Sequence, residues 1–379
     1  MSNNVLACFD GHSGGRIAFE VLGITPGKYY ASEVDKYAIE GSMAVFPDTI
    51  QLGDITRWRE WTIDWCSLDW FIGGSPCQGF SMAGKMAGTT AVLNGEKIVV
   101  DSREKYLYLK SAGAEFLSQS YLFWEYILCL DFVKMCNPKI KFFLENVKMK
   151  KEFLDLISNA IGVDPIFINS ALVSAQNRQR YYWCNWCVEQ PEDKGIVLAD
   201  ILESEPFKKT VMSDKFTNRN KDAGCLRDDV SGKAKSLSAM EYVKNGRQGD
   251  YIAIQRVATA SDIKGHDYNK RIYSTEGKSP SLTAASGGNL EPKIDIRKKS
   301  KCVRSSGRGS YDRHEWDSIS NCHYRKLTPR ECGRLQTIPE DILDTLLRAG
   351  ISNSQLYKMF GNGWTVDVIS HIFKQGIEQ

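Results

Sequence analysis

Residues 5–22, VLACFDGHSGGRIAFEVL, combine a strand pattern, a glycine-rich turn and a helix pattern. The apolar run over residues 5–9 has the length of a buried strand, and it stops at Asp10-Gly11. A helical pattern begins at Arg16, directly after two further glycines. Glycine lets the backbone turn tightly and approach a ligand, and a helix N-terminus attracts negative charge. The stretch therefore predicts the opening strand, turn and helix of an α/β domain.

The same alternation continues through the first 150 residues. Further strand patterns lie at residues 29–32, 70–72 and 141–144, and a helical stretch runs from 121 to 136. This rhythm is typical of a mostly parallel sheet with helices on both faces, so we expect a doubly wound α/β fold. In such folds, ligands bind at the carboxyl ends of the strands.

A different composition begins near residue 200. Residues 200–326 are rich in Ser, Gly, Lys and Asn and show weak periodicity. A helical pattern resumes at Thr328, with Pro329 at a favourable first helical position. We therefore expect a smaller domain inserted into the first one. The expected parts are the main domain (1–190), the insert (191–326) and a C-terminal return to the main domain (327–379).

Charge is segregated along the chain. Residues 207–330 hold 26 Lys and Arg against 14 Asp and Glu, whereas the rest holds 23 against 32. A basic domain on an otherwise acidic protein suggests a polyanionic partner, although a solvated lysine-rich face is the simpler alternative. Ordinary globular composition excludes wholesale disorder, with 42% hydrophobic and 25% charged residues.

Other features exclude whole classes of protein. The sequence has no apolar run of 18 residues and no basic leader before the first strand, which argues against membrane and secreted proteins. Eleven irregularly spaced cysteines favour a reducing compartment, so we expect a cytoplasmic protein. The pair Cys184 and Cys187 has metal-ligand spacing, but no second pair accompanies it, and we expect no metal site.

The glycine-rich turn and two acidic residues suggest a cofactor site. Glu33 ends the second strand, about 20 residues beyond the turn, where a carboxylate can accept hydrogen bonds from ribose hydroxyls. This spacing favours an adenosine-containing cofactor, either a dinucleotide or S-adenosylmethionine. Asp54, after Gly53, could form a third edge of the site, or it could simply belong to a turn.

Three motifs could carry chemistry. Cys77, in GGSPCQGFS, follows the third strand among small residues, and an accessible cysteine is a strong nucleophile. Glu145 ends the fourth strand, where Glu145-Asn146 is either functional or a helix-capping pair. Arg178 and Arg180 are two residues apart, so on a strand both would face one side. Arginine forks suit phosphate and nucleobase oxygens, and a surface ion pair is the alternative.

Taken together and in order, these motifs resemble the C5-cytosine DNA methyltransferases of phages and bacteria. The resemblance covers residues 5–190 and about 325–375, and includes GSPCQ (74–78), ENV (145–147) and the Gln176-x-Arg178-x-Arg180 pattern. It also includes LFWE (122–125), LTPREC (327–332) and GNG (361–363). It implies a Rossmann-like, S-adenosylmethionine-dependent fold with the insert as target-recognition domain, and a monomer that acts on double-stranded DNA, with or without a companion restriction endonuclease.

The resemblance also implies roles for residues of this chain. Cys77 would attack C6 of a flipped cytosine, Glu145 would hold N3 and the amine, and Arg178 and Arg180 would hold the base carbonyl and a phosphate. The S-adenosylmethionine site would comprise Phe9, Gly11, Gly14, Glu33, Asp54, Pro76, Leu122 and Asn362. The DNA contacts would comprise Gln78 and Ser81. The basic run Arg297, Lys298 and Lys299 in the insert would contact phosphates, or it could be a solvated loop.

The sequence departs from the family pattern at several points. Ser13 stands where the family's turn usually carries glycine, and Ser281 where a recognition segment usually carries threonine. The segment 82–120 is longer than in the smallest members; it includes the hairpin signature Asn94-Gly95, and we expect part of it to close over the target base as a mobile loop. Two alternative functions remain open: methylation of cytosine in tRNA, and DNA binding without catalysis.

Overall fold

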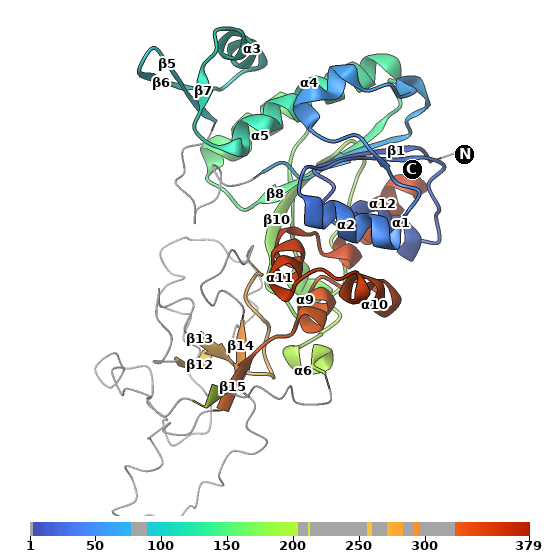
Figure 1. The fold of residues 1–379 in the computed structure, drawn as a ribbon, viewed down its shortest axis with the longest axis vertical. Helices are drawn as coiled ribbons and strands as arrows, with labels where there is room; N and C mark the ends of the chain where they lie inside the picture. Colours follow the sequence, from blue (N-terminus) through green and yellow to red (C-terminus); the bar gives the residue numbers. More distant parts are fainter. Residues whose placement is uncertain are drawn as a thin grey trace, which may run out of the picture.

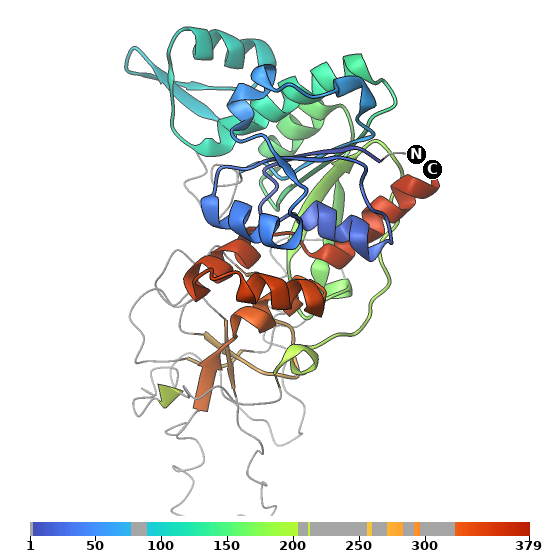
Figure 2. The ribbon, with the colours of Figure 1, turned by 45° about the vertical axis from the view of Figure 1, so that its right-hand side comes forward.

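The computed structural model describes residues 3–76, 89–203, 211–212, 256–259, 271–282, 292–295 and 323–379. The first 200 residues and the C-terminal 50 form one body, in which the two ends of the chain lie close together (Figures 1 and 2). The described strands of the insert lie below this body in the view of Figure 1, and β15 leads from them into the C-terminal helices.

A seven-stranded sheet forms the centre of the main body. Its strand order is β3-β2-β1-β4-β8-β10-β9; the pairs from β3 to β8 are parallel, and β10 is antiparallel to both neighbours. The expected doubly wound, mostly parallel sheet is therefore confirmed. The strands are β1 (Val5–Cys8), β2 (Tyr29–Ser32), β3 (Ile50–Gln51), β4 (Trp70–Gly73), β8 (Lys141–Val147), β9 (Ile166–Asn169) and β10 (Gln179–Cys184).

The central strands are apolar on both faces, because helices cover both sides of the sheet. In β1, Val5 and Ala7 belong to one hydrophobic cluster, and Leu6 and Cys8 belong to the other. Side chains alternate along β4 and β8 in the same way. Burial on both faces explains why these strands read as continuous apolar runs in the sequence.

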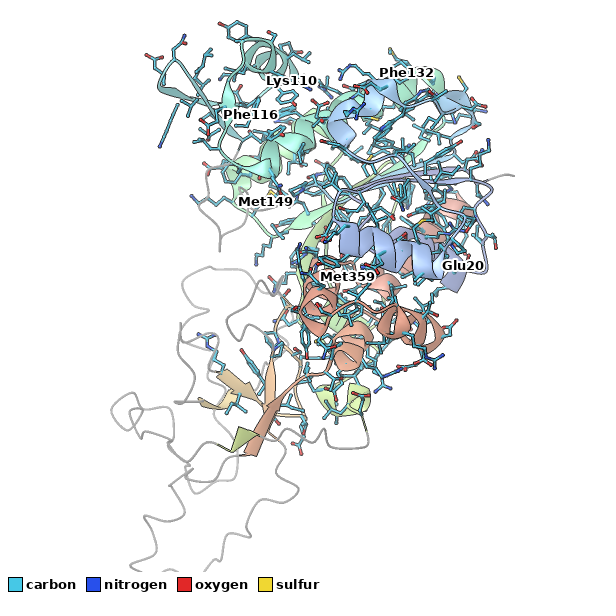
Figure 3. All side chains as sticks on the ribbon, viewed as in Figure 1. Glu20, Lys110, Phe116, Phe132, Met149 and Met359 are labelled. Atoms are coloured by element: carbon cyan, nitrogen blue, oxygen red, sulfur yellow. The ribbon has the colours of Figure 1, made fainter. Side chains whose placement is uncertain are left out.

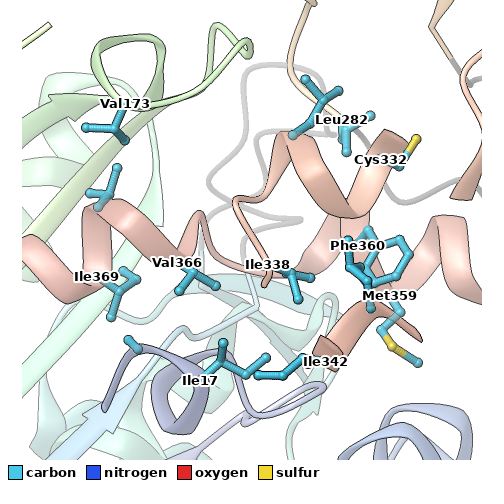
Figure 4. Close-up of a cluster of buried hydrophobic side chains, with 14 of the residues drawn as sticks. Ile17, Val173, Leu282, Cys332, Ile338, Ile342, Met359, Phe360, Val366 and Ile369 are labelled. Atoms are coloured by element: carbon cyan, nitrogen blue, oxygen red, sulfur yellow. The ribbon is translucent and has the colours of Figure 1, made fainter. Parts of the chain in front are cut away.

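The C-terminal helices cover the first face of the sheet together with the N-terminal ones. Ile17 of α1 lies near Ile342, Val366 and Ile369 in one buried cluster (Figure 4). Pro329 takes the predicted first helical position, behind a capping box formed by Thr328 and Glu331. The helices on this side are α1 (Gly14–Val21), α2 (Lys36–Val45), α9 (Pro329–Leu335), α10 (Glu340–Arg348), α11 (Asn353–Asn362) and α12 (Val366–Glu378).

The opposite face is covered by α4 (Leu122–Cys136) and α5 (Lys151–Ile161). Beyond them, residues 89–117 form a separate small module, where Lys110 and Phe116 lie (Figure 3). It contains α3 (Arg103–Ser111) and the antiparallel sheet β6-β5-β7 (Glu96–Val99, Thr90–Leu93, Glu115–Phe116). The predicted hairpin is confirmed, with left-handed Asn94 (φ 52°) and Gly95 (φ 84°) joining β5 to β6.

Glu125 of α4 anchors this module to the main body. Its fully buried carboxylate accepts hydrogen bonds from Tyr106 (2.5 Å) and Lys110 (2.5 Å) of α3, and from the indole of Trp58 (3.2 Å). Residues 89–117 are therefore a folded addition. The expectation that part of residues 82–120 closes over the target base stays a prediction, and residues 82–88 lie outside the described residues.

The described part of the insert contains a second sheet of order β11-β15-β14-β13-β12. Residues 274–279 dock on the main body, where Asn177 donates its backbone N–H to Ser279 and Ser279 donates to Ala175. The short helix α6 (Leu198–Ile201) packs in the same cluster as α9. The domain boundaries at 190 and 326 stay predictions. The strands of this second sheet are β11 (Val211–Met212), β12 (Arg256–Thr259), β13 (Arg271–Tyr273), β14 (Lys293–Asp295) and β15 (His323–Lys326).

Candidate active site

The topology places the candidate site between β1 and β4. These neighbouring strands are parallel, but their connections lie on opposite faces of the sheet. The chain passes from β1 to β2 through α1 on one face, and from β4 to β8 through α4 on the other. In open α/β sheets, ligands bind at the carboxyl ends of the strands where the chain changes direction in this way. The glycine turn follows β1, the Cys77 loop follows β4, and Glu145 lies near the end of β8.

Glu33 and the glycine turn form one edge of this site. The backbone N–H of Gly11 donates to Glu33 Oε2 (2.8 Å), and Oε1 accepts from the backbone N–H groups of Val34 and Asp35. Gly11 has φ +59°, and an added Cβ there, or at Gly53, would meet no atom within 4 Å. The carboxylate is therefore held in place beside open space, which fits its predicted role as an acceptor for ribose hydroxyls.

The other predicted cofactor residues belong to several elements of the main body. Phe9 is left-handed (φ 58°), Gly14 begins α1, and the carboxylate of Asp54 caps the 3₁₀ turn η1 (Ile55–Glu60) by accepting from Thr56. Leu122 begins α4 and is half-buried. Asn362 ends α11 with an exposed side chain, and Pro76 is the last described residue before Cys77.

A buried carboxylate under the turn escaped the sequence analysis. Asp10 accepts hydrogen bonds from the Ser13 hydroxyl (2.7 Å) and the Tyr29 hydroxyl (2.7 Å). Burial, with Glu33 nearby, raises the pKa of Asp10 to about 7. Ser13 adopts the left-handed conformation (φ 65°), which favours glycine, and its hydroxyl also lies 2.5 Å from that of Ser42. The hydrogen bonds to Asp10 and Ser42 hold Ser13 in this conformation at the position where the family usually has glycine.

The stability of the protein should therefore depend on the protonation of Asp10. Because the pKa of Asp10 is raised from 3.8 to about 7, its contribution to stability is complete below about pH 4 and is lost as the pH rises through 7. The loss should amount to roughly 2–4 kcal/mol. Asp10→Asn should remove this part of the pH dependence and be more stable than the wild type at pH 8. Urea unfolding of both proteins at pH 5 and pH 8 measures the difference; parallel profiles would contradict it.

Glu145 and Arg180 form the second edge of the site. Arg180 Nε lies 2.9 Å from Glu145 Oε1, and both side chains are largely buried. In the antiparallel pairing of β8 with β10, Glu145 lies opposite Tyr182. Burial and the nearby Glu145 raise the pKa of Tyr182, which keeps its phenol neutral. Glu145 and Arg180, which the sequence analysis names as separate catalytic candidates, thus lie side by side at the strand ends.

Asn146 fixes the loop that leads to Cys77. Its amide donates to the backbone carbonyl (3.3 Å) and the hydroxyl (3.1 Å) of Ser75, and its side-chain oxygen accepts from the N–H of Val147. Asn146 is buried, so these bonds join the ends of β4 and β8. Cys77, Gln78 and Ser81 lie outside the described residues, as do Arg297, Lys298 and Lys299.

Arg178 contacts main-chain carbonyls of two distant segments. It stands one residue before β10, and its buried guanidinium donates to the carbonyls of Leu282 (3.2 Å), Gly361 (3.2 Å) and Gly363 (2.8 Å). These bonds join the insert segment to the C-terminal return, and the expected base or phosphate contact of Arg178 stays a prediction. The guanidinium of Arg178 therefore holds residues 282 and 361–363 in place beside the start of β10.

Two further residues of the site were missed. His12 is buried against Gly363, where an added Cβ would lie 2.3 Å from the imidazole, and burial lowers the pKa of His12 to about 4. Trp364 contacts the glycine turn and the loop after β4. Both contacts join residues more than 280 positions apart, and no local pattern signals them.

Metal-binding groupings do not occur in the described ranges, where no three His, Cys, Asp or Glu side chains gather. Cys184 lies in β10, where burial raises the pKa of its thiol to about 12, and Cys187 is exposed. In the described part of the chain no helix is long and apolar enough to span a membrane.

The order of the motifs and this geometry agree with a known family. The family model "C-5 cytosine-specific DNA methylase" matches residues 4–101 and 110–378. The chain belongs to this family. The matched residues include Glu33 with the glycine turn, Glu145 with Arg180, and the C-terminal return.

Relatives and solved structures of similar length accompany this match. The orphan methyltransferase M.SPBetaI of Bacillus phage SPbeta is 29% identical, over 98% of this chain and 96% of its own. The type II methyltransferase M.HhaI of Haemophilus parahaemolyticus is 25% identical, over 96% and 91%. In fold, the chain resembles the methyltransferase EhMeth of Entamoeba histolytica (TM-score 0.58, 13% identity, 100% and 98% covered) and a DNMT2 mutant of Spodoptera frugiperda (0.57, 17%, 99% and 99%).

Proposed function

We propose that this member of the family is an active DNA (cytosine-5-)-methyltransferase, which transfers a methyl group from S-adenosylmethionine to a cytosine in a short double-stranded target. The observation that carries the proposal is the buried ion pair of Glu145 and Arg180 beside the loop that leads into Cys77. A buried carboxylate paired with an arginine at the strand ends suits catalysis, and it is not an exposed surface group that would contact the DNA backbone.

The reaction needs a nucleophile because C5 of cytosine is too electron-poor to accept a methyl group unaided. The Cys77 thiolate adds to C6, and C5 then carries the electron pair that takes the methyl group. Glu145 hydrogen-bonds N3 and the exocyclic amine and stabilises the charge that develops in the ring. A base then removes the C5 proton, the electrons of that bond restore the double bond, and Cys77 leaves. Arg180 keeps the Glu145 carboxylate oriented throughout.

These steps require that the target cytosine lies outside the stacked DNA duplex. The Glu145 pair is largely buried at the strand ends, and a stacked cytosine presents neither face of C6 to a protein thiol. The target would therefore be flipped into the pocket. Asn146, through Ser75, would keep the Cys77 loop at a fixed distance from the base.

The residues around the glycine turn suit S-adenosylmethionine. The backbone N–H of Gly11 holds the Glu33 carboxylate, and a Cβ added at Gly11 would meet no atom within 4 Å, which leaves room beside the turn for an adenosine group. Glu33 would hold the ribose hydroxyls, and Phe9, Asp54 and Leu122 would contact the adenosine; Gly11, Gly14, Pro76 and Asn362 complete the proposed set. When bound, S-adenosylmethionine supplies the electrophilic methyl group.

Transfer of labelled methyl groups tests this function. The full-length protein should incorporate tritium from labelled S-adenosylmethionine into duplex DNA, and bisulfite sequencing should place the mark on cytosines of one short sequence. Transfer to tRNA alone would favour the tRNA branch of the family. Binding of DNA without any transfer would identify an inactive homologue.

We expect basic side chains of the insert to contact the phosphates of the DNA backbone. We expect the triple variant Arg297→Ala, Lys298→Ala, Lys299→Ala to flatten the dependence of log K on log salt by about 0.9 for each phosphate that is no longer neutralised, since each neutralised phosphate releases counterions. The methylated sequence should not change, because phosphate contacts position and base contacts specify. The control removes two exposed basic residues of the C-terminal helices, Arg348→Ala with Lys374→Ala. Equal slopes for the triple variant and the wild type would exclude this run from the interface.

A further inference from the structure

Lys278 is a buried cation at the base of the insert. It is 7% exposed, and its ammonium donates to the main-chain carbonyls of Ala171 (2.9 Å), Ser174 (3.1 Å) and Ile196. Each of its three N–H donors therefore has an acceptor. The acceptors belong to the 3₁₀ turn η4 (Ser170–Leu172), to the segment before β10 and to the segment before α6. One side chain of the insert thus holds three segments of the chain together.

Backbone hydrogen bonds close the same joint. The N–H groups of Leu198 and Ala199, at the start of α6, donate to the carbonyls of Gly277 (2.9 Å) and Thr275 (2.8 Å). The segment through which the chain enters the insert is therefore bound to a segment through which it comes back to the main body. Lys278 follows Gly277 directly, so its side chain anchors the centre of this joint.

The joint lies beside the segment that leads to the catalytic candidates. Residues 274–282 run along residues 174–178, and Gln176 and Ser279 form a parallel bridge between the two. The second segment continues into β10, which carries Arg180 next to its carboxylate partner. A shift of the joint would therefore be passed along a few residues of backbone to the ion pair of the site.

A buried ammonium is a costly way to hold backbone segments together. Lysine is rarely buried, because burial disfavours its charged form. Burial lowers the pKa of Lys278, and the nearby Asp193 and Asp200 act in the opposite direction. Apolar side chains often stabilise such a position equally well, whereas a buried polar group can fix one arrangement of the parts that it joins. The ammonium reaches three carbonyls at once only while their segments keep this arrangement.

From this geometry we infer that Lys278 is a positioning residue for methyl transfer. Its ammonium holds the insert in one orientation relative to β10, so that DNA bound by the insert presents its cytosine to Glu145 and Cys77 in the reactive position. The inference rests on the proposed function, because it presupposes that the insert binds the DNA. It goes further in assigning the coupling between DNA binding and catalysis to one side chain outside the site.

Single-turnover methyl transfer tests the inference, with saturating S-adenosylmethionine and a duplex that carries the sequence found by bisulfite sequencing. Lys278→Met should transfer methyl groups about ten- to a hundredfold more slowly than the wild type, because a displacement of about 1 Å between reacting groups can cost about a hundredfold. The Kd for S-adenosylmethionine should not change, because the glycine turn and Glu33 follow β1 and β2, which β4 and β8 separate from β10.

Lys141→Met is the matched control. Lys141 is also a half-buried lysine whose ammonium donates to a main-chain carbonyl, that of Gly376 in α12. It stands at the start of β8, whereas Glu145 lies near the end of that strand. Both variants should lose stability in urea unfolding, but Lys141→Met should keep the wild-type rate of transfer. The rate therefore separates a positioning role from a role in stability alone.

The outcomes are distinct. A wild-type rate in Lys278→Met, or an equal loss of rate in both variants, would overturn the inference, while a wild-type protein that transfers no methyl groups would overturn the proposed function itself. If Lys278→Met does not fold, hydrogen exchange of the wild type replaces it. The backbone N–H of Ser279, which donates to Ala175 (2.7 Å), should exchange more slowly with the target duplex than with a scrambled duplex of the same length. Equal exchange with the two duplexes would also overturn the inference.

Discussion

Replacing Glu145 with glutamine is expected to lower the rate of methyl transfer by about 10²- to 10⁴-fold, the usual range for a positioned acid–base or charge-stabilising group. Glutamine keeps the size of the side chain and can still hydrogen-bond the base, but it cannot supply a proton or balance charge at N3. It also removes the partner of Arg180, which lies 2.9 Å from the carboxylate. Single-turnover measurements with labelled S-adenosylmethionine isolate this step.

The loss should appear in the rate constant and not in the fold. Glu152→Gln provides the control, because Glu152 is an exposed glutamate in the first turn of α5. The control should transfer methyl groups like the wild type, and both variants should unfold cooperatively. A Glu145→Gln protein with more than a tenth of the wild-type rate would remove Glu145 from the proposed chemistry.

Serine at position 77 is expected to abolish turnover while leaving DNA binding intact. A serine hydroxyl is far less ionised and less nucleophilic than a cysteine thiol near neutral pH, so the addition to C6 fails. The matched control is Cys66→Ser, since Cys66 is a free and exposed cysteine of the main body. Transfer assays and gel-shift titrations on the same preparations separate the two properties. Unchanged methylation by Cys77→Ser would assign the nucleophile to another residue.

Local sequence patterns predict much of this fold. The strand-turn-helix unit at residues 5–22, the hairpin at Asn94-Gly95 and the helix that begins at Pro329 all appear as expected. Each depends on neighbours in the chain: apolar residues on a buried strand, two residues that tolerate left-handed φ, and a ring that matches the first helical turn. Such features can be predicted because their physical cause lies within a few residues.

The contacts that assemble the site depend on distant residues. Asn146 holds Ser75 across 71 positions, and Arg178 binds the carbonyl of Gly363 across 185. An arginine two residues from another suggests a shared face, yet the chain uses Arg178 to bind main-chain carbonyls of two distant segments. The sequence shows that these side chains are present, but only the packing of the C-terminal return against the strand ends shows what they touch.

Asp10 illustrates the same limit. In the sequence it reads as the end of a strand and the start of a turn, typical for an aspartate. In the structure it is buried beside Tyr29 and supports a serine in a conformation that favours glycine. The departure at Ser13 and the carboxylate at Asp10 thus belong together, which the residue types alone do not reveal.

The covalent bond between this protein and its target is the central claim, and trapping tests it most directly. Duplex DNA with 5-fluorocytosine at the target should form a complex that survives denaturation when S-adenosylmethionine is present, because fluorine cannot leave C5 as a proton. Mass spectrometry of the digested complex should find the methylated fluorocytosine on the peptide that contains Cys77. A complex attached to any other residue, or active methyl transfer without a trapped complex, would contradict the account.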